Sequence, residues 1–328
     1  MTEENKILLV YNTCFVKSNI DNTDWYIESI ESFLNQDFDG FQIVMSSCLN
    51  SPECFKTIAE KFGNRISYCY HQQPHTVNIT FNKTVQECVR EFGEFEQYVY
   101  IDSGCTFGDN PDILSHAYKS MKKNNYGMLS LQVDTDEALQ AIDATLKYQS
   151  KDVQITGSDL VIPLGKACNG HVIFHSNEFL KSYHNKIWPD VFAAYCTEST
   201  FTFLCAAIGK KWAILKDLQI EHRKAIDGPS SSVPHISPKY GNPWNNLLYG
   251  RNAIDFINDE DAHKVGMGYE ECNGIMMHDK NAYDKNGLPI DSDNLKKNIN
   301  KYFFLDESEL DYSDISCRFI SHIKNEGN

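Results

Sequence analysis

The carboxylate that stands out in this sequence is Asp102, which ends a short run of strand-forming residues, Tyr98 to Ile101. The residues directly after it, Ser103 and Gly104, are small. A divalent metal ion on a diphosphate takes one or two protein carboxylates, and phosphate oxygens and waters fill its other positions. Asp102 could supply such a ligand from the end of a strand. An aspartate in this place also caps turns, and the residue taken alone favours that simpler interpretation.

Strand and helix patterns alternate along the chain and place Asp102 at the end of the fourth strand. The patterns predict strands at 6–11, 41–47, 65–70 and 97–102, with helices at 25–36, 51–63 and 79–93 between them. Farther along they predict helices at 112–127, 135–149 and 199–209, and strands at 128–133 and 211–222. Residues 168–183 read as a strand and then a short helix. This alternation argues for a doubly wound, mostly parallel α/β sheet, which binds ligands at the carboxyl ends of its strands.

This order of elements, with YVYIDSG at 98–104 as its fourth strand, resembles the GT-A fold of nucleotide-sugar glycosyltransferases, in particular the broad family-2-like group. In that Rossmann-like fold the fourth strand ends in an Asp-x-Asp motif that holds Mn²⁺ or Mg²⁺ on the donor's diphosphate. Asp102 matches the first acid, and Gly104 stands where the second is expected. Three alternatives follow: His222 completes the metal site, the metal is held loosely, or there is none.

The resemblance also implies a set of donor-binding residues. Asn82, 20 residues before Asp102, matches an asparagine that approaches the nucleotide sugar, although polar residues are common in a first helical turn. His222 ends the last predicted strand and would join Asp102 on the metal, and Arg223 after it would clamp the diphosphate. Thr13 and Ser47, after the first two strands, would line the base and ribose pocket. Ser103 and Gly104 would lie beside the diphosphate.

Two acids are candidates for the base that deprotonates the acceptor hydroxyl. Glu198 matches the acidic residue that opens a helix in the family's pattern, and a raised pKa would suit that role. An acid in a first helical turn is also favoured by the helix dipole alone, without any catalytic reason. Asp190, in IWPDVF, is the competing candidate.

Composition and charge narrow the classes of function. The 328 residues carry a formal net charge of -15, so the sequence lacks the overall basic character of nucleic-acid-binding proteins. The 11 cysteines include no CxxC pair, which argues against a structural zinc site. The N-terminus has no signal-peptide pattern, and no apolar run is long enough to cross a membrane. We therefore expect a cytoplasmic protein in a reducing compartment.

These observations predict a GT-A catalytic domain at 1–224 and an acceptor-side or packing extension at 225–328. The expected activity is metal-assisted transfer of a sugar from a nucleotide-diphosphate donor, with a UDP-sugar favoured and Mn²⁺ or Mg²⁺ as cofactor. A glycan, a protein or a small molecule could be the acceptor, and modified DNA is not excluded. The alternatives are a nucleotidyltransferase and a non-catalytic protein that binds nucleotide sugars through a degenerate site. A nucleotidyltransferase usually has a glycine-rich loop after its first strand, and YNTCFVKSN has no glycine.

Overall fold

The structure is a computed structural model, and it describes residues 5–14, 23–48, 52–71, 77–133, 155–156, 159–162, 164, 171–190, 197–222, 247–248, 251–252, 267–270, 275–278, 284, 288–304 and 315–318. Its strands and helices are β1 (Ile7–Cys14), α1 (Thr23–Leu34), β2 (Phe41–Cys48), α2 (Pro52–Phe62), the 3-10 helix η2 (Gly63–Arg65), β3 (Ser67–His71), α3 (Val77–Phe92), β4 (Gln97–Asp102), β5 (Cys105–Thr106), α4 (Ile113–Asn124), β6 (Met128–Val133), β7 (Ile155–Thr156), β8 (Asp159–Val161), β9 (Val172–Ser176), α6 (Glu178–Ser182), α7 (Thr197–Ala207), β10 (Trp212–His222), β11 (Leu247–Leu248), β12 (Arg251–Asn252), β13 (Met267–Glu270), β14 (Ile275–His278), α11 (Ser292–Phe303) and β15 (Ile315–Arg318).

Most of the described strands form one large sheet. Across this 11-stranded sheet the order is β15-β3-β2-β1-β4-β9-β6-β10-β8-β7, and β5 pairs with β10 beside that path. The neighbours β3, β2, β1 and β4 are parallel, as are β6 and β10. Strand β9 lies between β4 and β6 and is antiparallel to both. The sheet is therefore mostly parallel, with one reversed strand near its centre.

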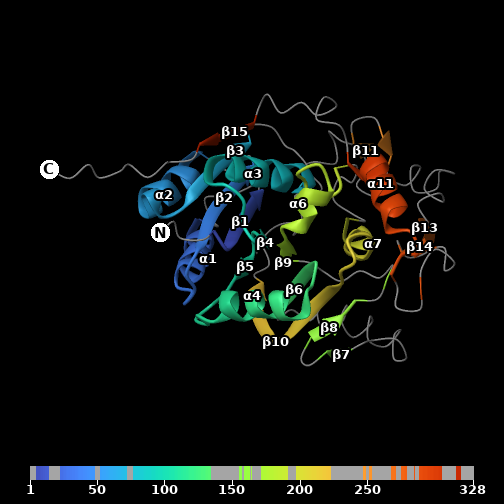
Figure 1. Cartoon of the computed structure of the whole chain (residues 1–328). Helices are drawn as coiled ribbons and strands as arrows, with labels where there is room; N and C mark the ends of the chain where they lie inside the picture. Colours follow the sequence, from blue (N-terminus) through green and yellow to red (C-terminus); the bar gives the residue numbers. More distant parts are fainter. Residues whose placement is uncertain are drawn as a thin grey trace.

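Strand β1 explains why helices cover both faces of the sheet. Its side chains alternate between two hydrophobic clusters: Ile7, Leu9 and Tyr11 belong to one, and Leu8 and Val10 to the other. All five are fully buried, as a continuous apolar run in a parallel sheet predicts. Helix α3 packs in the cluster of Leu8, whereas α1 and α4 pack in the cluster of Ile7, on opposite faces (Figure 1). The predicted fold class, a doubly wound, mostly parallel α/β sheet, is confirmed.

The elements begin and end close to the predicted bounds. Strand β4 spans the six residues predicted for it, and β10 starts one residue later than expected. Helix α7 begins at Thr197, two residues before the expected start, so that Glu198 lies in its first turn. The helix expected at 135–149 lies outside the described residues.

Two described segments beyond residue 224 pack onto the sheet and its core. Helix α11 contributes Leu295 and Ile299 to the hydrophobic cluster that holds α3 and α7, and the Phe304 ring stacks on Tyr183 with the centroids 5.2 Å apart. Strand β15 pairs with β3 at the edge of the sheet. The domain boundary expected at residue 224 stays a prediction, but α11 packs in the core of the preceding part and β15 extends its sheet.

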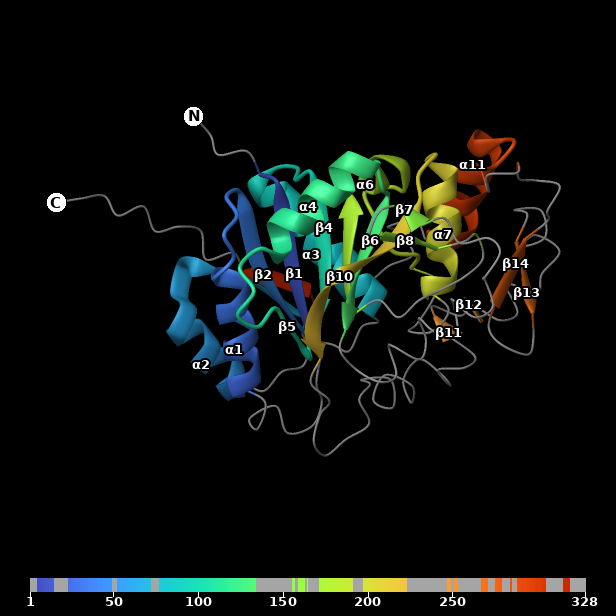
Figure 2. The same cartoon turned by 90° about the horizontal axis from the view of Figure 1, so that it is seen from below.

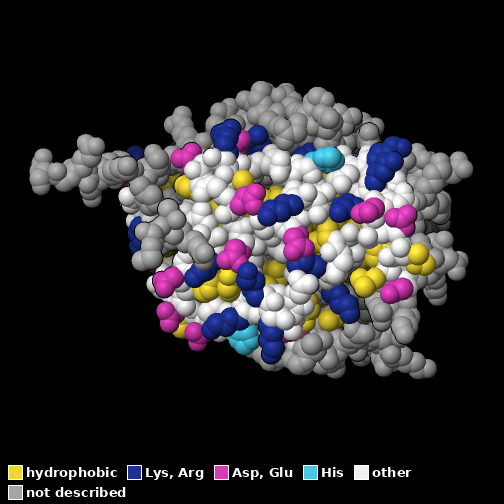
Figure 3. Space-filling model, in the orientation of Figure 1, with side chains coloured by type: hydrophobic (Ala, Val, Ile, Leu, Met, Phe, Trp, Pro, Cys, Tyr) yellow, Lys and Arg dark blue, Asp and Glu magenta, His cyan; other side chains and the backbone are white. Residues whose placement is uncertain are grey.

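The surface carries charged side chains of both signs, as expected from a sequence with 30 Lys and Arg and 45 Asp and Glu residues. On the face shown in Figure 3, basic and acidic side chains are interspersed. Among the described helices, none has the length and apolar content that crossing a membrane requires.

His175 on β9 gives the core a measurable pH dependence. The ring is fully buried, its Nε2 accepts a hydrogen bond from Trp188 Nε1 at 2.9 Å, and its Nδ1 lies 3.0 Å from the Tyr98 carbonyl oxygen. Because Nε2 is an acceptor, Nδ1 carries the proton and the ring is neutral. Burial lowers the pKa of His175 to about 3, although hydrogen bonds to backbone carbonyls act in the opposite direction.

We predict that this histidine destabilises the fold in acid. An unfolded chain protonates His175 near pH 6.5, so its contribution to stability is complete above that pH and is lost progressively as the pH falls toward about 3. At pH 4 the loss should be on the order of 3 kcal/mol. Urea unfolding at pH 7 and pH 4 would show it as a difference: His175→Gln should lose about 3 kcal/mol less between the two pH values than the parent. Equal losses in the two proteins would contradict the prediction.

Candidate metal centre and active site

Asp102, His171 and His222 meet at one end of the sheet. His171 Nδ1 lies 3.2 Å from Asp102 Oδ2, and His222 Nε2 lies 3.7 Å from the same oxygen. The two imidazole rings are tilted by 30° with their centroids 4.2 Å apart. One ligand atom from each residue lies within 4.8 Å of the others. Among the described residues, this is the one group of three or more His, Cys, Asp or Glu side chains placed to hold a metal ion.

The sheet topology builds this cluster from three strands. In the antiparallel pair β4–β9, Ile101 lies opposite Val172, and the Asp102 amide beyond it donates to the His171 carbonyl at 2.8 Å. The reversed strand β9 therefore starts where β4 ends. In the pair β10–β5, His222 lies opposite Cys105, which follows the turn after Asp102. Figure 2 shows β5 beside the end of β10.

The turn after β4 orients the carboxylate. Asp102 Oδ1 accepts hydrogen bonds from the Ser103 amide at 2.8 Å and from the Ser103 hydroxyl at 3.5 Å. The Ser103 carbonyl in turn accepts from the Tyr11 hydroxyl at 2.7 Å, which fixes the turn to β1. With Oδ1 engaged in this way, Oδ2 faces the two histidines. Asp102 thus caps a turn and presents a ligand atom at the same time.

The electrostatics keep Asp102 ionised. Burial acts to raise its pKa, but hydrogen bonds and charge interactions with His171 and His222 outweigh this effect and hold the pKa of the carboxyl well below its usual range. The side chains of Asp102, His171 and His222 are 35%, 25% and 13% exposed, so an ion in solution can reach them. A carboxylate oxygen and two imidazole nitrogens fit a first-row transition ion such as Mn²⁺, whereas Mg²⁺ prefers oxygen ligands.

The sequence prediction for this cluster included two of its three residues. It expected Asp102 and His222 to meet, and the structure brings them together; their binding of a metal stays a prediction. It missed His171. Position 104, where the resemblance expects a second acid, is a glycine, and the His171 ring lies beside Asp102 instead. The signal was present as a histidine directly before the strand VIFHS, but it becomes visible only once β9 is known to run antiparallel to β4.

Thr13 and Ser47 lie opposite each other at the carboxyl ends of β1 and β2, as predicted for residues of one pocket. The Thr13 hydroxyl donates to the Ser46 carbonyl at 3.2 Å. The Ser47 hydroxyl is fully buried and has no hydrogen-bond partner among the described residues. A buried hydroxyl without a partner is costly, and a bound ligand could satisfy it. Contact with a nucleotide stays a prediction for both residues.

Asn82 and Asp190 lie together in the interior. The Asn82 amide donates to Asp190 Oδ1 at 3.0 Å and to the Trp188 carbonyl at 2.7 Å, and its oxygen accepts from the Ile187 and Trp188 amides. Asp190 Oδ2 forms an ion pair of 2.7 Å with Lys186 Nζ, and both side chains are 0% exposed. Asn82 therefore fixes the segment that carries Asp190. Its contact with a donor, and a catalytic role of Asp190, stay predictions.

Three other predicted residues have less structural definition. Glu198 lies in the first turn of α7, but its side chain is outside the described part. Arg223 directly follows His222 and is also outside the described residues. Gly104 lies in the turn between β4 and β5 and is partly exposed. Their proposed roles at the diphosphate and the acceptor stay predictions.

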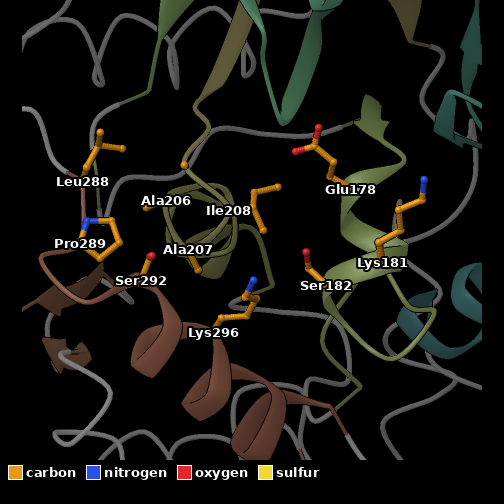
Figure 4. Close-up of a pocket in the computed structure, with 11 residues that line it drawn as sticks. Glu178, Lys181, Ser182, Ala206, Ala207, Ile208, Leu288, Pro289, Ser292 and Lys296 are labelled. Atoms are coloured by element: carbon orange, nitrogen blue, oxygen red, sulfur yellow. The ribbon is translucent and has the colours of Figure 1, made fainter.

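A separate pocket of about 460 Å³ lies between α6, the end of α7 and the start of α11 (Figure 4). None of the three cluster residues lines it. Of the charged residues that line it, Glu178 pairs with Lys210 at 3.0 Å and Lys181 pairs with Glu94 at 3.4 Å. Lys296 lines the pocket as well, and we assign the pocket no role.

No protein-family model and no curated protein matches the chain. Solved structures do resemble it. Residues 1–349 of S. aureus TarS show 15% identity and a TM-score of 0.47, over 66% of this chain and 60% of that one. A mycobacterial protein shows 12% identity and a TM-score of 0.45, over 67% and 68%. GalNAc-T7, crystallised with UDP, GalNAc and Mn²⁺, shows 10% identity and a TM-score of 0.44, over 68% and 44%.

The aligned part is less than two thirds of the TarS and GalNAc-T7 chains. Because all three TM-scores are below 0.5, we transfer no residue role and no ligand from these proteins.

Proposed function

We propose that this chain is a glycosyltransferase that moves a sugar from a nucleotide-diphosphate donor to an acceptor. The observation that carries the proposal is the cluster of Asp102, His171 and His222 at the carboxyl end of a doubly wound sheet. Ligands of such sheets bind at that end, and a diphosphate needs a positive partner in a chain with a net charge of -15. A bound divalent ion would neutralise negative charge on the leaving diphosphate.

In this proposal Asp102 supplies the oxygen ligand, and the two histidines supply nitrogen ligands. Ser103 holds the carboxylate so that Oδ2 faces both rings. His171 takes the role that the resemblance assigns to a second acid at position 104. Two nitrogen ligands favour Mn²⁺ over Mg²⁺ as the cofactor.

The remaining residues would bind the donor and activate the acceptor. Ser47, with its buried unsatisfied hydroxyl, and Thr13 would contact the base and ribose of a UDP-sugar, and Arg223 would contact the diphosphate. Glu198 would take the proton of the acceptor hydroxyl if the reaction inverts the anomeric centre. The buried ion pair of Asp190 with Lys186 favours Glu198 over Asp190 as the base, because a base must reach its substrate.

The acceptor is a glycan, a protein, a small molecule or a modified DNA base. A nucleotidyltransferase and a non-catalytic nucleotide-sugar-binding protein are the alternatives. Assays with a panel of nucleotide sugars and with nucleoside triphosphates, each with and without Mn²⁺, would separate the three. Metal-dependent release of the nucleoside diphosphate supports the transferase, release of pyrophosphate from a nucleoside triphosphate supports the nucleotidyltransferase, and donor binding without turnover supports the binding protein.

His171 gives a direct test of the ligand set. We predict that His171→Gln weakens Mn²⁺ binding at least about tenfold, because one of three protein ligands is lost. Mutating only the residues that hydrogen-bond to metal ligands already lowers metal affinity about tenfold or more. Calorimetric titration with Mn²⁺ would measure the change. His116→Gln, on the exposed face of α4, is the matched control and should bind like the parent. Unchanged affinity in His171→Gln would remove His171 from the site.

A further inference from the structure

Cys69, in the middle of β3, is disulfide-bonded. Its side chain is fully buried among the hydrophobic residues on the α3 face of the sheet. Four described cysteines carry thiols instead, namely Cys54, Cys88, Cys105 and Cys205. The partner of Cys69 is therefore one of the remaining cysteines, which are Cys14, Cys48, Cys168, Cys196, Cys272 and Cys317.

The strand register selects Cys317 from this set. In the antiparallel pair β15–β3, Cys317 lies directly opposite Cys69, between the pairs Ser316–Tyr70 and Arg318–Tyr68. Directly opposed residues point to the same face with Cβ atoms about 4.5–5.5 Å apart, and their Cα spacing falls in the range that a disulfide bridges.

Cys48 is the nearest alternative, and the register disfavours it. It lies on β2, the other neighbour of β3, opposite His71, whereas Cys69 lies opposite Ser46. Cys48 and Cys69 are therefore diagonal to each other across the ladder. Neighbouring parallel strands lie about 4.8 Å apart and two residues span about 6.6 Å along a strand, so the two Cα atoms are about 8 Å apart, beyond the usual disulfide spacing.

We propose that a Cys69–Cys317 disulfide fastens the C-terminal strand β15 to the edge of the sheet. In its formation two thiols lose two protons and two electrons as the sulfur–sulfur bond forms. A low-molecular-weight disulfide accepts the electrons and is reduced to two thiols. Strand β15 is the last in the sheet order and pairs with β3 alone among the described strands. A covalent bond here holds a strand that has a single hydrogen-bonded neighbour. With β15 held in place, the edge of β3 stays covered.

The bond also lies next to the predicted donor pocket. Cys69 Sγ is 3.7 Å from His71 Nε2, and that nitrogen is 3.2 Å from the Ser46 hydroxyl and 3.3 Å from the Thr84 hydroxyl. The covalent attachment therefore reaches, through one histidine, the carboxyl end of β2 that carries Ser47. It also conflicts with the expected reducing compartment, because stable disulfides are rare in the cytosol.

Peptide mapping without reductant tests the bond directly. After alkylation in denaturant, trypsin cuts the chain into peptides 66–83 and 302–318, which contain one cysteine each, Cys69 and Cys317. We expect one disulfide-linked mass that joins these two peptides and separates on reduction. A mass that links 66–83 to any other cysteine peptide, or an alkylated Cys69 in protein exposed to oxidised glutathione, would overturn the proposal. The measurement is made on denatured protein and does not require the fold to survive.

Thermal unfolding is a second test of the Cys69–Cys317 disulfide. Cross-linking residues this far apart in the chain removes many unfolded conformations, so Cys317→Ser should lower Tm by about 5 °C or more in the absence of reductant. Ser316→Ala, on the same strand, keeps both cysteines and is the matched control. With excess reductant the parent should fall to the Tm of Cys317→Ser. A parent Tm that does not respond to reductant would contradict a bond that stabilises the edge.

Discussion

Asp102→Asn is expected to reduce metal-dependent turnover of the nucleotide-sugar donor on the order of 1,000-fold, since the charge stabilisation that a metal supplies is worth several kcal/mol. The asparagine keeps the shape of the side chain and its acceptor for the Ser103 amide, but it lacks the negative charge that faces His171 and His222. Initial rates at saturating Mn²⁺, with released nucleotide as the readout, would measure the effect. The loss should appear in turnover and in metal affinity together.

The control for this variant is Asp109→Asn. Asp109 lies seven residues farther along the same segment and is exposed, so removing its charge should leave the rate within about twofold of the parent. Full activity of Asp102→Asn with normal Mn²⁺ dependence would show that the metal binds elsewhere. Equal loss in both variants would point to a general effect of charge near the site.

Lys186→Met is expected to destabilise the protein by about 3–5 kcal/mol, because it leaves the Asp190 carboxylate buried without its cation. Both side chains of this pair are 0% exposed and their charged atoms are 2.7 Å apart. The double variant Lys186→Met/Asp190→Asn should recover much of the loss, since the asparagine is neutral. Urea unfolding of the parent and the two variants would give the three free energies of unfolding.

An exposed ion pair with the same spacing provides the control. Lys56 and Glu60 on α2 are also four residues apart, but their side chains are 75% and 67% exposed. Lys56→Met should therefore change stability by less than about 1 kcal/mol. If Lys186→Met is as mild as Lys56→Met, and Asp190→Asn abolishes turnover in a stable protein, Asp190 and not Glu198 is the base.

Local patterns were sufficient to predict most of the sheet. The apolar run at Ile7–Tyr11 is buried on both faces, so a continuous hydrophobic strand was the correct interpretation. Helices such as α3 and α7 followed from periodicity and came within a few residues of their observed bounds. The meeting of Asp102 and His222 followed from the resemblance, because each ends a strand at the same end of a parallel sheet.

What the sequence did not reveal depends on contacts between distant segments. The direction of β9 decides that His171 reaches Asp102, and direction is not encoded in the alternation of a short strand. The amide of Asn82 looked available to a ligand, yet residues 105 and more positions away occupy it. The pairing of β15 with β3 joins residues 244 to 250 positions apart in the sequence, and no local pattern signals it.

Pulsed EPR of the Mn²⁺-loaded protein tests the central claim most directly, because it detects nitrogen nuclei bound to the ion. If Asp102, His171 and His222 hold the metal, the spectrum should contain modulation from two imidazole nitrogens. Removing either histidine, in His171→Gln or His222→Gln, should leave the modulation of one nitrogen. A bound ion without nitrogen modulation, or a spectrum unchanged in both variants, would contradict the account.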